Sequence, residues 1–142
     1  MGKCYNKIEL NQPIDSVWQE VSDFHDMSWA SGVVTSLQKV GAVDGHHVGA
    51  KRVINDAFHE TLVEYNDDAH RFAYHIDDGP GPVSDSVVQD YVGVVQLTET
   101  DNGTLVEWSS SYHSAQDGEI ADLCNPIYIA LLSELKKNTT MH

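Results

Sequence analysis

The stretch 58-FHETLVEYNDDAHRFAYHI-76 decides the fold of this protein, because it predicts a β-hairpin. Its second half alternates Phe72, Tyr74 and Ile76 with polar residues, which is the period of a strand that buries one face. The segment 66-NDD-68 between the two halves consists of residues that favour turns. The hairpin therefore places two antiparallel strands in the middle of the chain.

The first strand of this hairpin carries a carboxylate on its apolar face. Side chains alternate between the two faces of a strand, so Phe58, Glu60 and Leu62 point the same way. A buried carboxylate without a partner costs several kcal/mol. Arg52 shares a strand face with Ile54 in the preceding apolar segment, and a charge-assisted pair with Glu60 would make both groups tolerable inside the protein.

Three roles for Arg52 and Glu60 stay open at this point. In the first role they form a structural ion pair, or Glu60 simply reaches water at the edge of a strand. Alternatively they hold the polar group of a ligand. In the third role they are catalytic candidates, with Glu60 transferring protons, because perturbed carboxylates mark both binding and catalytic sites.

Strands are predicted on both sides of the hairpin. The expected strands are 3–11, 33–40, 50–55, 59–66, 71–77, 86–99 and 103–113. Alternating hydrophobicity and the turn at 100-TDNG-103 carry this prediction.

Helices are predicted at both ends of the strand-rich region. Pro13 opens a helix at 14–23, and a second short helix is expected at 24–30. The segment 118–137 is a long amphipathic helix. Its apolar stripe comprises Ile120, Leu123, Ile127, Leu131 and Leu135. The economical arrangement is one α+β domain over residues 1–142, in which a curved seven-stranded antiparallel sheet wraps around the C-terminal helix.

Such an arrangement leaves room for a cavity between the sheet and the helix. We expect one enclosed space of roughly a few hundred Å³, the size of an ordinary ligand pocket. Its expected ligand-binding residues are Trp29, Arg52, Glu60, Tyr74, Tyr91, Trp108 and Leu131. Ordinary core packing is the alternative for any single aromatic residue. The loop 79-GPGP-82 is expected to form a lip of the entrance.

Composition and motifs exclude several classes of partner. The net charge is −14, from 22 acidic and 8 basic residues, which disfavours nucleic acid and anionic membranes. Cys4 and Cys124 fit no metal or redox spacing, and the N-terminal residues show no apolar signal region, so we expect a cytoplasmic protein with free thiols. The histidines lack metal-site spacing and the loop 41–49 lacks a P-loop lysine, so neither metal nor cofactor is expected.

Five segments together resemble a known superfamily: 17-VWQEVSDFHDMSWASGV-33, 49-GAKR-52, 60-ETLVEYNDDAHRFAYHI-76, the Gly-Pro loop 79–82 and 104-TLVEW-108. The resemblance is to the START-related helix-grip superfamily, often called SRPBCC. Bacterial members of the polyketide cyclase/dehydrase type are the most similar, and the plant abscisic-acid receptors belong to the same broad group. The resemblance implies a helix-grip fold with a deep apolar cavity under the long helix. It matches Glu60 to the receptors' cavity glutamate, whereas their hormone-binding lysine falls near Ala30.

Three functions are consistent with these observations. The first is binding of a small hydrophobic or aromatic molecule in the cavity, with a homodimer left open. The second is an enzyme of the polyketide cyclase or dehydratase kind that uses Glu60 as general acid or base. The third is a protein-interaction module with a vestigial cavity.

Overall fold

The computed structural model describes residues 2–84, 89–114 and 117–140. In this part of the chain one antiparallel sheet has the strand order β1-β7-β6-β5-β4-β3-β2. The strands are β1 (Gly2–Leu10), β2 (Leu37–Val40), β3 (Lys51–Ile54), β4 (Phe58–Asn66), β5 (Arg71–Asp78), β6 (Gln89–Thr100) and β7 (Gly103–His113). The helices are α1 (Ile14–Val21) and α2 (Asp117–Thr140), with single 3₁₀ turns η1 (Ser28–Ala30) and η2 (Gly81–Val83).

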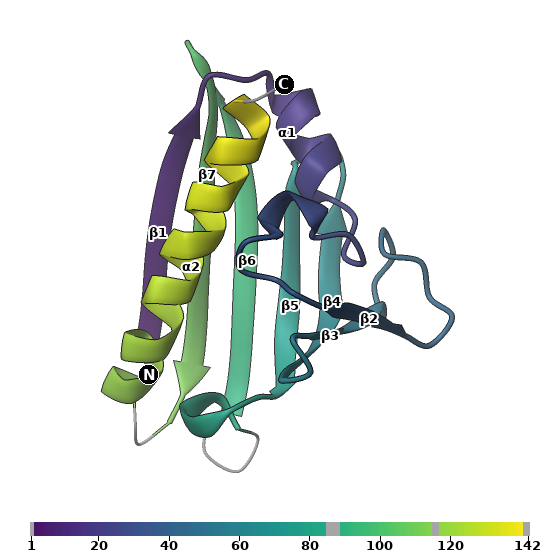
Figure 1. Ribbon diagram of the computed structural model, residues 1–142, viewed down its shortest axis with the longest axis vertical. Coiled ribbons are helices and arrows are strands. Elements are labelled where there is room, and N and C mark those ends of the chain that lie inside the picture. The colour runs from purple at the N-terminus through teal and green to yellow at the C-terminus, as the bar shows by residue number, and fades with distance from the viewer. Residues whose placement is uncertain (1, 85–88, 115–116, 141–142) are drawn as a thin grey trace.

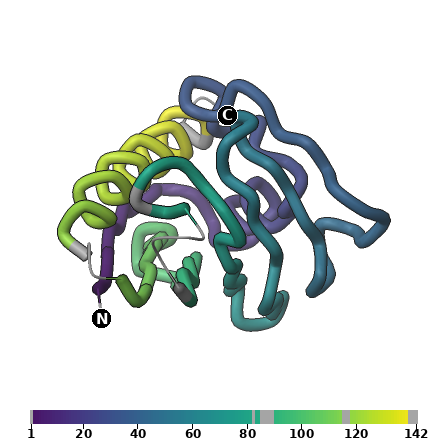
Figure 2. The backbone as a smooth tube through the Cα atoms, turned by 90° about the horizontal axis from the view of Figure 1, so that it is seen from below, coloured from purple at the N-terminus to yellow at the C-terminus, as the bar shows by residue number. Residues whose placement is uncertain are grey.

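The sheet curves, and all helices pack on one of its faces. The long helix α2 runs along this face beside β1 and β7, and the α1–η1 segment covers the neighbouring part (Figure 1). Seen from below, the strands from β1 to β2 bend around the space beneath these helices (Figure 2). The predicted curved seven-stranded antiparallel sheet with a long C-terminal helix is thereby confirmed. Among the described helices, none is long and apolar enough to cross a membrane.

The central hairpin follows the predicted alternation only as far as Leu62. Glu60 and Leu62 are buried and face the helices, opposite Ile76 and Tyr74 of β5. A β-bulge then follows between Leu62 and Glu64. Such a bulge inserts one extra residue and reverses the alternation beyond it. Tyr65, which the alternation places on the outer face, therefore packs on the core side, with its ring centroid 5.7 Å from that of Trp18.

Two predicted elements are shorter than expected. The helix expected at 24–30 is wrong, because only the single turn Ser28–Ala30 forms. The side chains of Asp23 and Asp26 accept hydrogen bonds of 2.9 Å from the backbone N–H groups of His25 and Ser28, and such local bonds compete with a helix. The strand expected at 33–40 begins at Leu37. The first residues of the strand expected at 86–99 lie outside the described part of the chain, and β6 is described from Gln89.

The buried face of α2 is rotated from the predicted stripe. Leu123 and Ile127 are half-buried, whereas Cys124 and Tyr128 are fully buried. Leu131 is buried as expected. The helix therefore presents a thiol and a phenol to the sheet where the sequence predicted two aliphatic side chains.

Gly93 of β6 makes room for an aromatic ring at the centre of the sheet. It lies directly opposite Tyr74 of β5 in the register. A Cβ atom at Gly93 would lie 2.3 Å from Cζ of Tyr74. The Tyr74 ring therefore contacts the backbone of β6 at a position where only glycine leaves enough space.

Replacing Gly93 by alanine tests this packing. We expect Gly93→Ala to lower the free energy of unfolding by about 1–3 kcal/mol, because the methyl group overlaps a buried ring. Urea denaturation measures the change. Gly118→Ala is the matched control, because nothing lies within 4 Å of a Cβ at this exposed position near the start of α2. The control should be neutral or slightly stabilising, and an equal loss in both variants would contradict the role given to Gly93.

Candidate functional site

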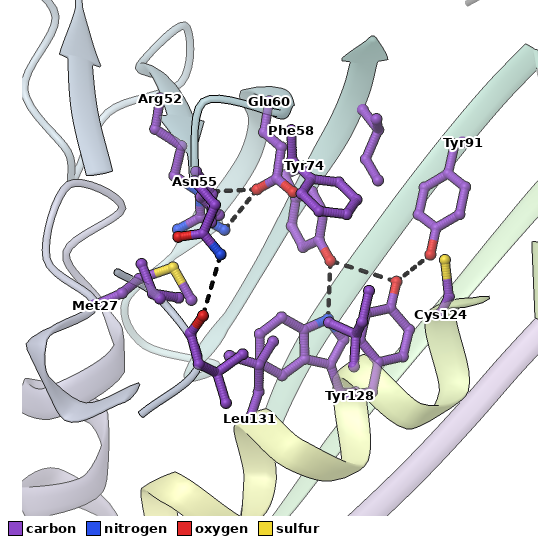
Figure 3. Close-up of a pocket in the computed structure, with 16 residues that line it drawn as sticks. Met27, Arg52, Asn55, Phe58, Glu60, Tyr74, Tyr91, Cys124, Tyr128 and Leu131 are labelled. Atoms are coloured by element: carbon purple, nitrogen blue, oxygen red, sulfur yellow. Dashed lines mark hydrogen bonds and ion pairs between the residues drawn. The ribbon is translucent and has the colours of Figure 1, made fainter. Parts of the chain in front are cut away.

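A cavity of about 100 Å³ lies between α2 and the sheet (Figure 3). It is lined by Met27, Val33, Val34, Arg52, Ile54, Asn55, Phe58, Glu60, Tyr74, Ile76, Tyr91, Trp108, Cys124, Ile127, Tyr128 and Leu131. Most of these side chains are apolar or aromatic. The volume is smaller than the few hundred Å³ expected from the sequence, because the Tyr128 and Cys124 side chains of α2 occupy part of the space.

Arg52 and Glu60 form the charged end of the cavity. They are cross-strand neighbours on β3 and β4, and both are buried. Nε of Arg52 donates to Oε1 of Glu60 at 2.8 Å, and Nη2 lies 2.7 Å from the same oxygen. Nη1 donates to the carbonyl of Phe24 at 3.0 Å, and Cζ of Arg52 lies 3.8 Å from the centroid of the Phe24 ring. The ion pair expected from the sequence is present, and it also ties the segment after α1 to the sheet.

Burial dominates the ionisation of Glu60. Loss of water raises the pKa of this carboxyl above its ordinary value of 4.5, although the charge and hydrogen bond of Arg52 oppose the shift. The nearby Asp77 carboxylate adds to the increase. Glu60 therefore takes up a proton more readily than an exposed glutamate does.

Three tyrosines and a tryptophan form the other end of the cavity. Nε1 of Trp108 donates to the hydroxyl of Tyr74 at 2.9 Å, and the Tyr74 hydroxyl donates to that of Tyr128 at 3.5 Å. The Tyr128 and Tyr91 hydroxyls are hydrogen-bonded to each other. The rings of Trp108 and Tyr128 stack with centroids 5.3 Å apart. A single hydrogen-bonded chain thus connects β5, β6, β7 and α2 (Figure 3).

The groups at this end stay protonated at neutral pH. Burial raises the pKa values of Tyr74, Tyr91 and Tyr128 above the ordinary value of 10.0. It also raises the pKa of the Cys124 thiol to about 11. Because a thiol reacts as its thiolate, Cys124 is a poor nucleophile. Glu60 is therefore the better candidate for proton transfer.

Half-buried side chains mark the entrance of the cavity. Asn55, which follows β3, and Phe58, the first residue of β4, lie here, together with Val33, Val34 and Ile127. The side-chain oxygen of Asn55 accepts hydrogen bonds from the backbone N–H groups of Thr35 at 2.8 Å and Ser36 at 3.2 Å. Its amide donates to the Val33 carbonyl at 3.1 Å. One side chain thus fastens the 33–36 segment over the entrance.

The structure brings together six of the seven residues predicted from the sequence to bind ligand. Arg52, Glu60, Tyr74, Tyr91, Trp108 and Leu131 line the cavity. Trp29 does not, because η1 packs against α2 and its ring lies beside Trp108, with centroids 6.4 Å apart. The 79–82 loop, predicted as a lip, contributes no described residue to the lining. Instead it buries Val83 beside Gly79, close to Phe58.

Sequence reasoning missed two cavity residues on α2. Tyr128 and Cys124 are four residues apart, so they lie on one face of the helix. The same spacing continues from Tyr128 to Leu132, which is also buried. The sequence contains this spacing, but the stripe through Leu123 and Ile127 is more apolar and gives the stronger helical pattern. Asn55 was missed because its role depends on a contact with a distant loop.

In the part of the chain that the structure describes, no three His, Cys, Asp or Glu side chains group as metal ligands would. His46 and His47 both lie near Asp44, with Nδ1 to Oδ1 distances of 2.9 and 3.7 Å, but all three are exposed. They lie in the β2–β3 loop, away from the cavity lining.

Comparison with known proteins identifies the family of the chain and agrees with its fold. The family model described as "Polyketide cyclase / dehydrase and lipid transport" matches residues 1–139. The chain belongs to this family. Its fold is the helix-grip fold of the SRPBCC superfamily, as the sequence resemblance predicted. A search of curated proteins found no match.

Solved structures give the same fold. A protein from Nitrosospira multiformis is 39% identical, with a TM-score of 0.92 over 95% of this chain and 94% of that chain. A Thermobifida fusca protein is 23% identical, with a TM-score of 0.84 over 96% and 91%. Norcoclaurine synthase from Thalictrum flavum, solved in complex with dopamine and hydroxybenzaldehyde, is 17% identical, with a TM-score of 0.74 over 99% and 87%. The last two likenesses show the fold alone.

A double-mutant cycle tests the buried ion pair. We expect Glu60→Leu to lower the free energy of unfolding by about 3–5 kcal/mol, because it leaves the Arg52 charge buried without a partner. The double variant Arg52→Met/Glu60→Leu should be more stable than Glu60→Leu alone, because it removes both charges. Urea denaturation of the wild type, both single variants and the double variant measures the coupling. Strictly additive losses would show that the two charges do not stabilise each other.

Proposed function

We propose that this protein binds a small hydrophobic or aromatic molecule in the cavity between α2 and the sheet. The observation that supports this most directly is an apolar and aromatic lining with one buried charged pair, Arg52 and Glu60, at one end. Ligand pockets combine such a lining with a few polar groups that orient the ligand. The description of the family, which includes lipid transport, is consistent with this function. Cys4 and Cys124 are both free and buried, which supports the cytoplasmic location expected from the sequence.

The size of the cavity favours a small ligand. A volume of about 100 Å³ is below the roughly 300–1,000 Å³ of ordinary ligand pockets. A single aromatic ring is therefore the appropriate scale for the closed cavity. A larger ligand would need the 33–36 segment, which Asn55 holds in place, to move away from the entrance.

Filling the cavity tests the proposal. p-Cresol is a suitable probe, and its binding can be followed by the indole N–H signal of Trp108 in NMR spectra, because Trp108 lines the cavity. We expect Leu131→Trp to weaken p-cresol binding at least about ten-fold, because the larger side chain occupies the cavity, at a cost of about 1–3 kcal/mol in stability. Ile129→Trp is the matched control on the same helix, because Ile129 is 55% exposed. Equal affinities in both variants, or no p-cresol binding by the wild type, would refute the proposed site.

The pKa of Glu60 favours a second candidate function, that of a dehydratase-like enzyme. A carboxylate whose pKa is raised by burial is a stronger base than an exposed one. In a dehydration, Glu60 would remove the proton from the carbon between a carbonyl and a carbinol. The hydroxyl group would then leave as water after receiving that proton from Glu60, which regenerates the carboxylate, and a conjugated enone would form. The family description, which names cyclases and dehydrases, is consistent with this chemistry.

A β-hydroxyketone tests the second candidate. We expect the protein to convert 4-hydroxybutan-2-one, which is no larger than one aromatic ring, into but-3-en-2-one, detected by ultraviolet absorbance. The rate should fall as the pH drops through the pKa of Glu60, which lies above 4.5, because only the ionised carboxylate accepts the proton. Glu60→Gln should reduce turnover by about 10²-fold or more with little change in substrate binding. If the protein binds p-cresol but shows no enone formation above the buffer rate, binding without this chemistry is the function.

A further inference from the structure

One oxygen of the Glu60 carboxylate has no hydrogen-bond partner among the residues that the structure describes. Both contacts from Arg52 go to Oε1. Within the described residues, no hydrogen bond reaches Oε2. Glu60 lines the cavity. Because Oε1 takes both contacts from Arg52, Oε2 is the carboxylate oxygen that a ligand atom can approach.

We infer that the ligand is an uncharged aromatic phenol or amine that donates a hydrogen bond to Oε2 of Glu60, and that the cavity discriminates against carboxylates. This inference rests on the proposed binding function and specifies its ligand class. A carboxylate oxygen is a strong acceptor, and a charge-assisted hydrogen bond is roughly twice as strong as a neutral one. An O–H or N–H group on one edge of a ring would satisfy Oε2, and the ring would contact the aromatic wall.

Arg52 does not offer a site for an anion. Its Nε and Nη2 groups face Glu60, Nη1 donates to the Phe24 carbonyl, and the Phe24 ring covers one face of the guanidinium. Arg52 is the one basic residue in the cavity lining among the residues described. A ligand carboxylate at this end would therefore approach the Glu60 carboxylate without a free cation to balance it. Like charges at such a short distance repel, so an acidic ligand is disfavoured.

A cationic ligand is also disfavoured, because it would upset the balance of charge in the cavity. Arg52 already balances the charge of Glu60, so an ammonium group would add an uncompensated charge to a buried site. At the opposite end, the hydroxyls of Tyr74, Tyr91 and Tyr128 are hydrogen-bonded to one another. That end therefore presents mainly ring surfaces. Glu60 Oε2 is the polar atom best placed to orient a ligand.

Four ring compounds of similar size test this inference by NMR titration of the wild-type protein at neutral pH. p-Cresol and 4-methylaniline carry a donor, 4-methylanisole carries no donor, and 4-methylbenzoate is an anion. We expect both donor compounds to bind about ten-fold or more tightly than 4-methylanisole. We expect 4-methylbenzoate to bind weakest. Equal binding of p-cresol and 4-methylanisole, or 4-methylbenzoate binding as tightly as p-cresol, would overturn the inference and leave the binding function intact.

Variants of the ion pair identify the atom responsible. In Arg52→Met/Glu60→Leu, which removes both charges, the ratio of p-cresol to 4-methylanisole affinity should fall to about one. In Arg71→Met/Glu64→Leu, which removes a half-exposed ion pair between β4 and β5 outside the cavity lining and keeps Oε2, the ratio should stay near the wild-type value. If this control lowers the ratio as much as the Arg52/Glu60 variant does, the assignment to Oε2 is wrong. If none of the four compounds binds the wild type, the proposed binding function itself fails.

Discussion

The buried contact between the Arg52 guanidinium and the Glu60 carboxylate is the constraint on which the site depends. Two charged groups inside a protein are tolerated only when they are paired and hydrogen-bonded. The pair meets this condition by joining β3 to β4 at 2.8 Å and by reaching the Phe24 carbonyl at 3.0 Å. It therefore fixes the segment after α1 against the sheet. The cavity has a charged end because this buried pair lies where β3 and β4 line it.

The cavity is built from two ends with different chemistry. At one end a carboxylate is paired through a single oxygen. At the other, the Trp108, Tyr74, Tyr128 and Tyr91 groups are hydrogen-bonded in a chain and stay protonated. Under the proposed binding function, this asymmetry would give a bound ring one preferred orientation. It also separates the two candidate functions, because orientation alone is sufficient for binding, whereas dehydration additionally needs the Glu60 carboxylate to accept a proton.

Much of the fold and part of the site could be predicted because they depend on local patterns. Alternation within 58–62 and the spacing of Arg52 and Ile54 placed Arg52 and Glu60 on one face. The prediction failed where a β-bulge or local side-chain hydrogen bonds interrupted the regular pattern. The bulge at Val63 turned Tyr65 toward the core, and side-chain bonds from Asp23 and Asp26 replaced the expected second helix with a single turn.

The sequence by itself determined the class of fold, the long C-terminal helix and the buried Glu60 carboxylate, which requires a charged or hydrogen-bonding partner. These follow from periodicity and from the cost of burying charge, which act over a few residues. The tertiary structure decided between two stripes that the sequence of α2 contains, and thus that Tyr128 lines the cavity. It also placed Trp29 outside the lining. It also decided the cavity volume and the role of Asn55 at the entrance. The cavity volume and the contacts of Asn55 depend on how side chains from segments far apart in the sequence pack together. A local sequence pattern does not specify that packing.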